Sequence, residues 1–295
     1  MIEEKTEYQK GLVCEGGAMR GMFTAGVLDV FLEEGITFDG MVGVSAGATF
    51  GCNFKSRQLG RAIRYNKRFA RDKRYCSLES LLKTGNLYNA EFCYYTLPEK
   101  LDLFDWETFL KNPMKFYIVA TDVHTGRPVY HECKTSEPEE MEWYRASASM
   151  PLVSTPVKIQ GQTYLDGGIS NAIPLRFMEH IGYNRNVVIL TQDRNYQKKT
   201  QAGMQAFQKL RKQYPLCYEA MKNRHLMYNE ELADIHAKEA AGQILVIQPP
   251  EPLGIHRVEH DPEELERVYQ IGRTEAQKRL EEVRVFLREP KIETN

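Results

Sequence analysis

A serine set between two glycines, directly after a short apolar run, is the feature that most limits how this chain can fold. The sequence reads Gly43-Val44-Ser45-Ala46-Gly47 and follows an apolar run that begins at Phe38. The pattern Gly-x-Ser-x-Gly is typical of a sharp turn from a strand into a helix, which exposes the serine hydroxyl. The glycines permit the tight backbone path. The pattern predicts Ser45 as a candidate nucleophile, although five residues alone also fit an ordinary structural turn.

The residues before this turn complete a strand–helix–strand unit. A short apolar strand at residues 11–14 runs into the glycine-rich loop 15–21, and apolar residues at helical spacing then follow over residues 23–34. The second strand, residues 38–44, ends at the serine turn. Such a βαβ unit implies parallel strands and a right-handed crossover, so we expect an α/β fold.

Composition excludes several classes of protein. The chain has 295 residues, 42% of them hydrophobic, and a net charge of −1, which gives no general attraction to nucleic acid. Its first residues are charged, and no apolar run reaches the length of a membrane-spanning helix. The six cysteines include no Cys-x-x-Cys pair, and the seven histidines show no metal-ligand spacing. We therefore expect a cytoplasmic protein with reduced thiols, no metal and no cofactor.

The rest of the chain alternates strands and helices and then becomes mainly helical. Strands are predicted at residues 115–122, 127–132 and 187–191, a helix at 141–148, and a hairpin from 157–160 and 162–165. Residues 200–241 have helical patterns, one late strand is expected at 244–248, and Asp261-Pro262 marks the start of a last helix. We expect this last third to pack on the core as an extension.

Five arginines recur at spacings of four and three. They are Arg57, Arg61, Arg64, Arg68 and Arg71. On a helix this spacing places them on one face. The simpler interpretation is a solvated face that pairs with the acidic run 137–142, and the alternative is a patch that meets the phosphates of an anionic membrane surface.

Aromatic side chains are frequent between residues 76 and 110. They are Tyr88, Phe92, Tyr94, Tyr95, Phe104, Trp106 and Phe109. Most of them are expected in the core, although the wall of a lipid pocket needs the same residue types.

A serine nucleophile needs donors for the oxyanion and a base. The loop Gly16-Gly17-Ala18-Met19-Arg20-Gly21 follows a strand and precedes a helix, so its amide groups, with that of Ala46, can converge on an anion. A dinucleotide-binding loop is the competing interpretation. Ala18 stands at the middle glycine of that fingerprint and the next strand ends in a hydroxyl rather than an acid, which disfavours nucleotide binding.

Three residues are candidates for the base. Asp166 ends the second arm of the predicted hairpin and is followed by Gly167 and Gly168. Burial in an apolar pocket raises the pKa of such a carboxylate and makes it a useful base near pH 7. Asp122, at another strand end, is the rival carboxylate, and His256 fits the chain order of an α/β-hydrolase triad.

Taken together, these segments resemble the patatin-like phospholipase family. That family has a Gly-Gly-Gly-x-Arg/Lys-Gly loop, a Gly-x-Ser-x-Gly elbow and an Asp-Gly-Gly/Ala motif. Here they correspond to residues 16–21, 43–47 and 166–168, and the Ala-Ser-rich stretch 146–151 also resembles the family. Ala18 departs from the third glycine of the loop.

The resemblance implies a three-layer sandwich with a central, mostly parallel sheet over residues 10–195, followed by a mainly helical extension over 196–295. It implies a Ser–Asp dyad without histidine, in which Ser45 is the nucleophile and Asp166 the base. The oxyanion hole would use Gly16, Gly17, Ala18 and Ala46, supported by Arg20, Gly21, Gly43, Gly47, Gly167 and Gly168. The expected substrates are acyl esters of lipids. Two alternatives stay open: a triad esterase of Ser45, an aspartate and His256, and a non-catalytic lipid-binding regulatory protein.

Overall fold

A central sheet organises the fold, and the computed structural model describes residues 8–288. Eight strands form the sheet within this range. They are β1 (Lys10–Cys14), β2 (Gly40–Val44), β3 (Lys115–Asp122), β4 (Pro128–Glu132), β5 (Val157–Ile159), β6 (Gln162–Asp166), β7 (Arg185–Ile189) and β8 (Ile244–Ile247). The parallel strands β3, β2, β1, β7 and β8 are adjacent in that order, and β4, β5 and β6 add antiparallel pairs on the β3 side. The predicted mostly parallel α/β fold is confirmed.

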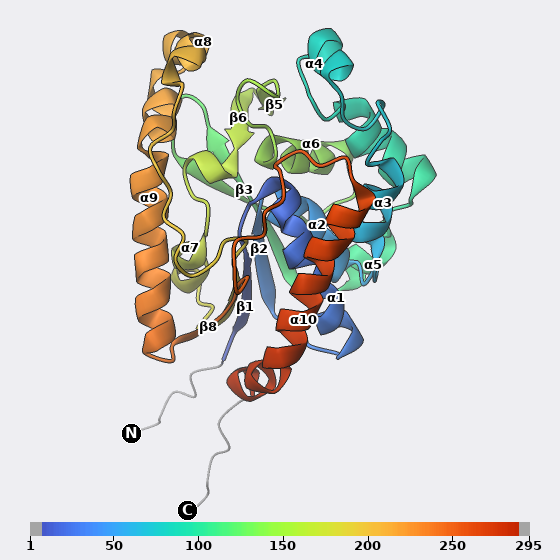
Figure 1. The fold of residues 1–295 in the computed structure, drawn as a ribbon, viewed down its shortest axis with the longest axis vertical. Helices are drawn as coiled ribbons and strands as arrows, with labels where there is room; N and C mark the ends of the chain where they lie inside the picture. Colours follow the sequence, from blue (N-terminus) through green and yellow to red (C-terminus); the bar gives the residue numbers. More distant parts are fainter. Residues whose placement is uncertain (1–7, 289–295) are drawn as a thin grey trace, which may run out of the picture.

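Helices cover both faces of the sheet. The α-helices are α1 (Gly21–Glu33), α2 (Ala46–Lys55), α3 (Arg61–Phe69), α4 (Leu78–Thr84), α5 (Trp106–Lys111), α6 (Pro138–Ser147), α7 (Leu175–His180), α8 (Gln208–Gln213), α9 (Pro215–Ala240) and α10 (Pro262–Leu287). The 3₁₀-helices are η1 (Ala18–Arg20), η3 (Gly167–Ile169) and η4 (Met204–Phe207), and η2 (Phe92–Leu101) is a π-helix. In Figure 1, α7 and α9 lie on one side of the strands and α1, α2, α3 and α10 on the other.

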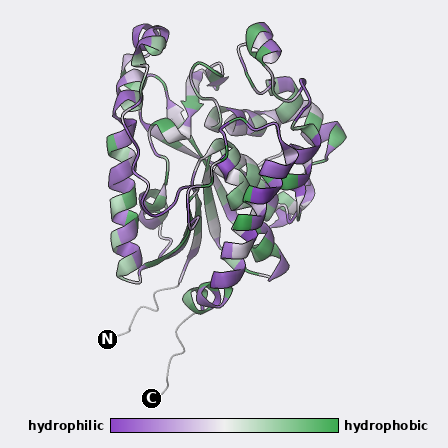
Figure 2. Ribbon diagram, in the orientation of Figure 1, coloured by the Kyte–Doolittle hydropathy of each residue, from purple (hydrophilic) through white to green (hydrophobic). Residues whose placement is uncertain are grey.

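Alternate residues of the strands face the two helical layers, as strand geometry requires. Leu12 and Met41 join the core shared with α1, α2 and α10. Val13 and Val42, their neighbours in sequence, join the core shared with α7 and α9. Both long C-terminal helices carry hydrophilic and hydrophobic residues along their length (Figure 2), so each has a buried and a solvated face.

Helices α1 and α10 touch backbone to backbone. A Cβ added to Gly26 would lie 2.1 Å from the Tyr269 carbonyl oxygen, and one added to Gly272 would lie 2.0 Å from the Phe23 carbonyl oxygen. The Tyr269 hydroxyl donates to Asp29 over 2.7 Å across the same contact. The first and last helices of the fold are therefore one packed pair.

The segment between α3 and β3 is irregular, as the sequence predicts, and contains the ten-residue π-helix η2 with Pro98 inside it. Phe92 and Phe109 are buried in the core, whereas Tyr88, Tyr94 and Phe104 line a cavity. The expectation that most of these aromatics lie in the core thus holds for Phe92 and Phe109, whereas the other three contribute to the cavity wall.

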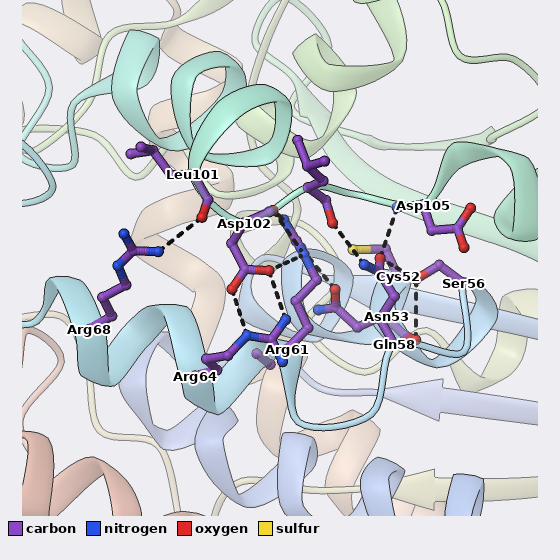
Figure 3. A network of polar contacts seen from close by, with 12 residues as sticks. Cys52, Asn53, Ser56, Gln58, Arg61, Arg64, Arg68, Leu101, Asp102 and Asp105 are labelled. Atoms are coloured by element: carbon purple, nitrogen blue, oxygen red, sulfur yellow. Dashed lines mark hydrogen bonds and ion pairs between the residues drawn. The ribbon is translucent and has the colours of Figure 1, made fainter.

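Of the five arginines of the series only Arg61 is buried, so the expected solvated face is present. Figure 3 shows Arg61, Arg64 and Arg68 in contact with Leu101 and Asp102. Arg61 is 4% exposed and donates to the Asp102 backbone carbonyl, while Arg64 forms a two-fold hydrogen bond with the Asp102 carboxylate at 2.8 Å. Arg68 donates to the Leu101 carbonyl, and Arg57 lies in the turn before α3 with φ 56°. The expected pairing with the acidic run 137–142 is wrong, because a nearer acid folds against α3.

None of the helices among residues 8–288 has the combination of length and apolar character that crossing a bilayer requires.

Candidate active site

Ser45 occupies the sharp turn between β2 and α2. Its backbone has φ 53° and ψ −119°, a conformation that costs a non-glycine residue about 1–3 kcal/mol. The side chain is partly exposed although the residues on either side are buried. The turn therefore has the strained geometry of a nucleophile elbow, which presents the hydroxyl at the carboxyl end of the sheet.

The two glycines of the elbow allow backbone segments to pass very close to one another. A Cβ on Gly47 would lie 2.4 Å from the Cys14 carbonyl oxygen at the end of β1. A Cβ on Gly43 would lie 2.5 Å from the Gly47 carbonyl oxygen. Because both obstacles are backbone atoms, no side-chain movement relieves them. Glycine is required here for close approach.

The Ala-Ser-rich stretch 146–151 fixes the backbone of the elbow through hydrogen bonds. The Ser45 amide donates to Ser147 Oγ over 2.8 Å, and the Ser147 hydroxyl donates to the Val119 carbonyl over 2.6 Å. Two residues later, the Ser149 carbonyl accepts from the Asp166 amide at 2.9 Å. The Ala-Ser-rich stretch at the end of α6 thus fixes the backbone of both Ser45 and Asp166.

The register of β3 explains how Asp166 reaches Ser45. Val44, the last residue of β2, pairs with Val119, and Asp166, the last residue of β6, pairs with Ala120. Strand β4 pairs with both Val119 and Ala120 and so occupies the other edge. Strands β2 and β6 therefore run toward each other along the same edge of β3 and end at adjacent positions. Their ends bring the serine and the aspartate together.

The Asp166 carboxyl is 2% exposed. Burial raises its pKa from 3.8 to about 6, against the opposing effects of the Arg224 charge, the hydrogen bond with the Ser45 side chain, the Gly168 amide and the Arg257 charge. The Gly168 amide donates to Asp166 Oδ1 over 2.8 Å. A carboxylate with this pKa is ionised near pH 7 and is a stronger base than an exposed aspartate.

Backbone amides for an oxyanion surround the serine. Among residues 8–288, the amides of Gly16, Gly17 and Ala46 donate to no backbone acceptor. A Cβ on Gly16 would lie 3.2 Å from the Ser45 Cβ, which places this loop against the nucleophile. Ala18 has φ 50°, in the region that favours glycine. The alanine therefore keeps the glycine-like backbone of the loop at some cost in strain.

An apolar cavity of about 480 Å³ opens at the two side chains. Ser45 and Asp166 lie in its wall together with Ala18 and Ala46. The rest of the lining is mainly aromatic and aliphatic and includes Phe50, Tyr65, Tyr88, Tyr94, Leu97, Phe104, Met141, Met150, Leu152, Phe207 and Met221. Pockets of this size and lining bind apolar groups.

The rival bases lie elsewhere. Asp122 Oδ1 accepts the amides of His124 at 2.8 Å and Thr125 at 2.9 Å, so this carboxylate closes a turn. His256 is exposed and is not part of the cavity wall. Of the candidate bases, the structure brings only Asp166 to Ser45.

One cluster has ligand types suited to a metal. His131, Cys133 and Glu140 have ligand atoms within 4.8 Å of one another. Glu140 already accepts from His131 Nε2 at 2.8 Å, if that nitrogen carries the proton, and from the Lys134 amide at 3.3 Å. Burial raises the pKa of the Cys133 thiol well above its ordinary value, which disfavours the thiolate that binds metals. These contacts account for the cluster as a structural one.

Sequence reasoning missed two residues close to the site. Glu15 is 1% exposed and accepts from the Thr191 amide at 2.6 Å and from the Tyr228 hydroxyl at 2.7 Å. Arg224 Nε donates to the Gly168 carbonyl beside Asp166. Glu15 could have been noticed as a charged residue directly after an apolar strand. Arg224 gives no such signal, because it lies in a stretch rich in lysine, arginine and glutamate.

An α/β sheet between two helical layers, with a strained serine turn at the end of its second strand, defines the class of fold and site. Comparison with known proteins makes the class specific. The patatin-like phospholipase pattern matches residues 12–178, more than half of the chain, and a domain of unknown function (DUF6363) matches residues 214–288. The chain belongs to the patatin-like phospholipase family. The expected boundary at residue 196 lies between the two matches and stays a prediction.

Known relatives match about three fifths of the chain. The uncharacterized protein YjjU of Escherichia coli is 34% identical over 187 residues, which cover 61% of this chain and 51% of YjjU. Lysophospholipase nte1 of Aspergillus fumigatus is 27% identical over 183 residues, covering 58% of this chain and 11% of that protein. The chain therefore matches about half of the first relative and a tenth of the second. Among solved structures, VipD from Legionella pneumophila aligns with a TM-score of 0.45 and 12% identity, covering 94% of this chain and 67% of that chain.

Proposed function

We propose that this protein is a serine hydrolase that cleaves fatty-acyl esters of lipids with a Ser45–Asp166 dyad. The observation that carries the proposal is a buried carboxylate with a raised pKa beside an elbow serine, both in the wall of one apolar cavity. Relatives named lysophospholipase support the lipid substrate. A cytoplasmic location, consistent with six free thiols, is part of the same proposal.

The chemistry follows from the positions of the groups. Asp166 accepts the proton of the Ser45 hydroxyl as the serine oxygen attacks the ester carbonyl. The negative charge that develops on the carbonyl oxygen is stabilised by the amides of Gly16, Gly17, Ala18 and Ala46. Asp166 returns the proton to the leaving alcohol, which leaves an acyl ester on Ser45. A water molecule, deprotonated by Asp166, then attacks this ester, and the serine departs with the proton.

Covalent labelling with a fluorophosphonate probe tests the proposal, because the probe reacts with activated serines. Wild type and His256→Ala should be labelled, Ser45→Ala should not, and Asp166→Asn should react at least about 100-fold more slowly. Ser136→Ala is the matched control, since Ser136 is exposed and lies outside the cavity wall.

Two outcomes would replace the proposal. Loss of labelling in a folded His256→Ala protein would favour the triad. Absence of any Ser45-dependent adduct on folded wild type would favour the non-catalytic lipid-binding protein. Circular dichroism of each variant separates these outcomes from failure to fold.

A further inference from the structure

Four cations gather beside the proposed dyad, and three of them come from beyond residue 196. They are Arg20, Lys198, Arg224 and Arg257. Arg20 lies in the glycine loop, and its Nε is buried without a hydrogen-bond acceptor in the described residues. Lys198 lies between β7 and α8, Arg224 on α9, and Arg257 between β8 and α10. Arg20 belongs to the glycine-loop motif, but neither the Ser–Asp chemistry nor the family motifs account for the other three cations.

Arg224 ties the cluster to the reacting groups. Its Nε donates to the Gly168 carbonyl, and the amide of the same glycine donates to Asp166. A Cβ on Gly168 would lie 3.0 Å from Arg224 Nη2 and 3.1 Å from Asp166 Oδ1. The Arg224 guanidinium and the Asp166 carboxylate thus both lie close to Gly168.

Lys198 is held in place by α9. Its amide donates to Asn229 Oδ1 at 2.8 Å, and Asn229 Nδ2 donates to the Lys198 carbonyl at 3.0 Å. Its Nζ lies 4.2 Å from the centre of the Tyr228 ring. Burial, together with the Arg224, Arg20 and Arg257 charges and against the Glu15 charge, lowers the pKa of this lysine to about 7. The fold thus holds a lysine amino group among other cations, and a bound anion would favour its protonated form.

The cluster has more positive than negative charge. Within residues 8–288 none of the four cations forms an ion pair with an acidic side chain within 4.0 Å. Two carboxylates, Glu15 and Asp166, act on the cluster, and Glu15 is engaged by Thr191 and Tyr228. With Lys198 protonated, four positive charges minus two negative charges leave two without a counter-charge. A phosphate group has about that charge and suits arginine and lysine donors.

One cation of the cluster borders the space in which the substrate would lie, and the other three stand outside the cavity lining. Arg257 is part of the cavity wall that contains Ser45 and Asp166. It is exposed, so it stands at the entrance, whereas Lys198 and Arg224 are partly buried. An acyl chain in the apolar cavity would therefore leave its polar headgroup at the entrance beside Arg257, whose charge acts on Lys198 and Arg224.

We infer that the C-terminal region completes the active site with a phosphate subsite, formed by Lys198, Arg224 and Arg257 with Arg20, that binds the phosphate headgroup of an acyl-lipid substrate. The inference rests on the proposed hydrolase function and gives the segment after residue 196 a role in substrate choice. The preferred substrates are phosphate-bearing acyl lipids rather than neutral glycerides.

Two substrates with the same acyl chain test this subsite: 1-acyl-glycerol-3-phosphate and 1-acylglycerol, both used as monomers. Wild type should have at least about tenfold higher kcat/KM for the phosphate-bearing substrate. In Lys198→Gln this preference should fall about tenfold, chiefly through KM. Lys199→Gln is the matched control, because it removes an exposed lysine one residue away and should keep the preference. A charge reversal at the entrance, Arg257→Glu, should also lower the preference.

The second arm distinguishes a lipid headgroup from free phosphate. Inorganic phosphate is added while hydrolysis of 1-acylglycerol is followed. Equal kcat/KM for the two substrates, with inhibition by phosphate that depends on Lys198, would overturn the headgroup assignment in favour of a free anion. Equal kcat/KM without such inhibition would overturn the subsite altogether. In both cases Ser45-dependent hydrolysis of 1-acylglycerol would leave the proposed function standing, and its absence would identify failure of that function instead.

Discussion

At the scale of single residues, the charge state of Asp166 decides whether it can act as the proposed base for Ser45. The carboxyl must be ionised to accept the serine proton, yet burial makes ionisation costly. Arg224 offsets part of this cost, and of the groups that lower the pKa of Asp166 it has the largest effect. The pKa of this carboxyl therefore depends in part on a residue of α9 about sixty positions further along the chain.

The pH profile of activity should show this control. For a neutral soluble ester, kcat/KM of wild type should rise with pH and reach half of its maximum near pH 6, where Asp166 loses its proton. Arg224→Met removes a charge that lowers the pKa of Asp166, so the midpoint should move to higher pH. Lys222→Met, an exposed change on the same helix, is the control. A wild-type midpoint near 4, or no movement in Arg224→Met, would contradict this assignment.

The sequence was sufficient to predict the two residues that stand in motifs, Ser45 and Asp166. It was not sufficient to predict the cations that surround them. Ser45 and Asp166 stand in short patterns whose spacing to glycine is itself the signal. Lys198 and Arg224 are two of many cations in a polar stretch, and their positions depend on how α9 packs against the sheet. No local pattern encodes such packing, so these residues could not have been predicted.

At the scale of elements, the end-to-end meeting of β2 and β6 on β3 is the central feature. The sequence predicts the strands themselves and the hairpin that contains β6. It does not predict that β6 pairs antiparallel with β3 directly beyond the last residue of β2, because strand pairing depends on tertiary contacts. The turn at Gln160 and Gly161, with φ 49° and 79°, fixes the hairpin register and so determines which residue reaches Ser45.

The rim of the cavity is a second feature at this scale. The loop after α4 and the loop after α6 meet there, where the Leu87 amide donates to the Val153 carbonyl at 2.8 Å. Three leucines of these segments are largely exposed. Leu78 and Leu82, on α4, are 73% and 87% exposed, and Leu152, after α6, is 54% exposed. Leu152 also lines the cavity, so apolar surface continues from the interior to the outside. We therefore expect the rim to contact a lipid surface through these apolar side chains.

Acidic substitutions on α4 should therefore separate lipid-surface activity from chemistry. In the double variant Leu78→Asp with Leu82→Asp, binding to phosphatidylcholine–phosphatidylglycerol vesicles in a sedimentation assay should fall at least about tenfold, from the lost transfer of apolar side chains. Hydrolysis of a soluble short-chain ester should continue. Val285→Asp changes an equally prominent apolar residue, 63% exposed, on α10 and should leave vesicle binding intact. Equal loss in both proteins would refute the role of the rim.

At the scale of the whole molecule, the site lowers the stability of the fold. The folded-state pKa of Asp166 is raised above its value of 3.8 in the unfolded chain, so the stabilising effect of the protonated form is complete below pH 3.8 and is lost as pH rises through about 6. A shift of this size corresponds to roughly 3 kcal/mol at neutral pH. The ionised form of Asp166, which the proposed chemistry requires, thus belongs to the less stable form of the protein.

Replacement of the base should reveal this cost. Asp166→Asn retains an oxygen for the Gly168 amide and removes the buried charge, so the free energy of unfolding should increase at pH 8 by up to about 3 kcal/mol. Below pH 4 the two proteins should have nearly equal stability. Urea denaturation at the two pH values measures the difference. If Asp166→Asn were less stable than wild type at pH 8, the ionised Asp166 carboxylate would stabilise the fold, and the expectation from its burial would be wrong.

The backbone contact between α1 and α10 has a consequence for how the protein is made. Ribosomes synthesise α1 before α10, and the α1 residues from Gly21 to Phe31 are all buried in the finished fold. Their partner follows about 240 residues later, as the hydrogen bond between Asp29 and Tyr269 shows. Throughout that interval the nascent chain exposes an apolar helix next to the nucleophile elbow, and such surfaces attract aggregation or chaperones. Ser45 is thus synthesised long before α10, the helix that covers α1, and we expect the chain to depend on protection from aggregation until α10 has emerged.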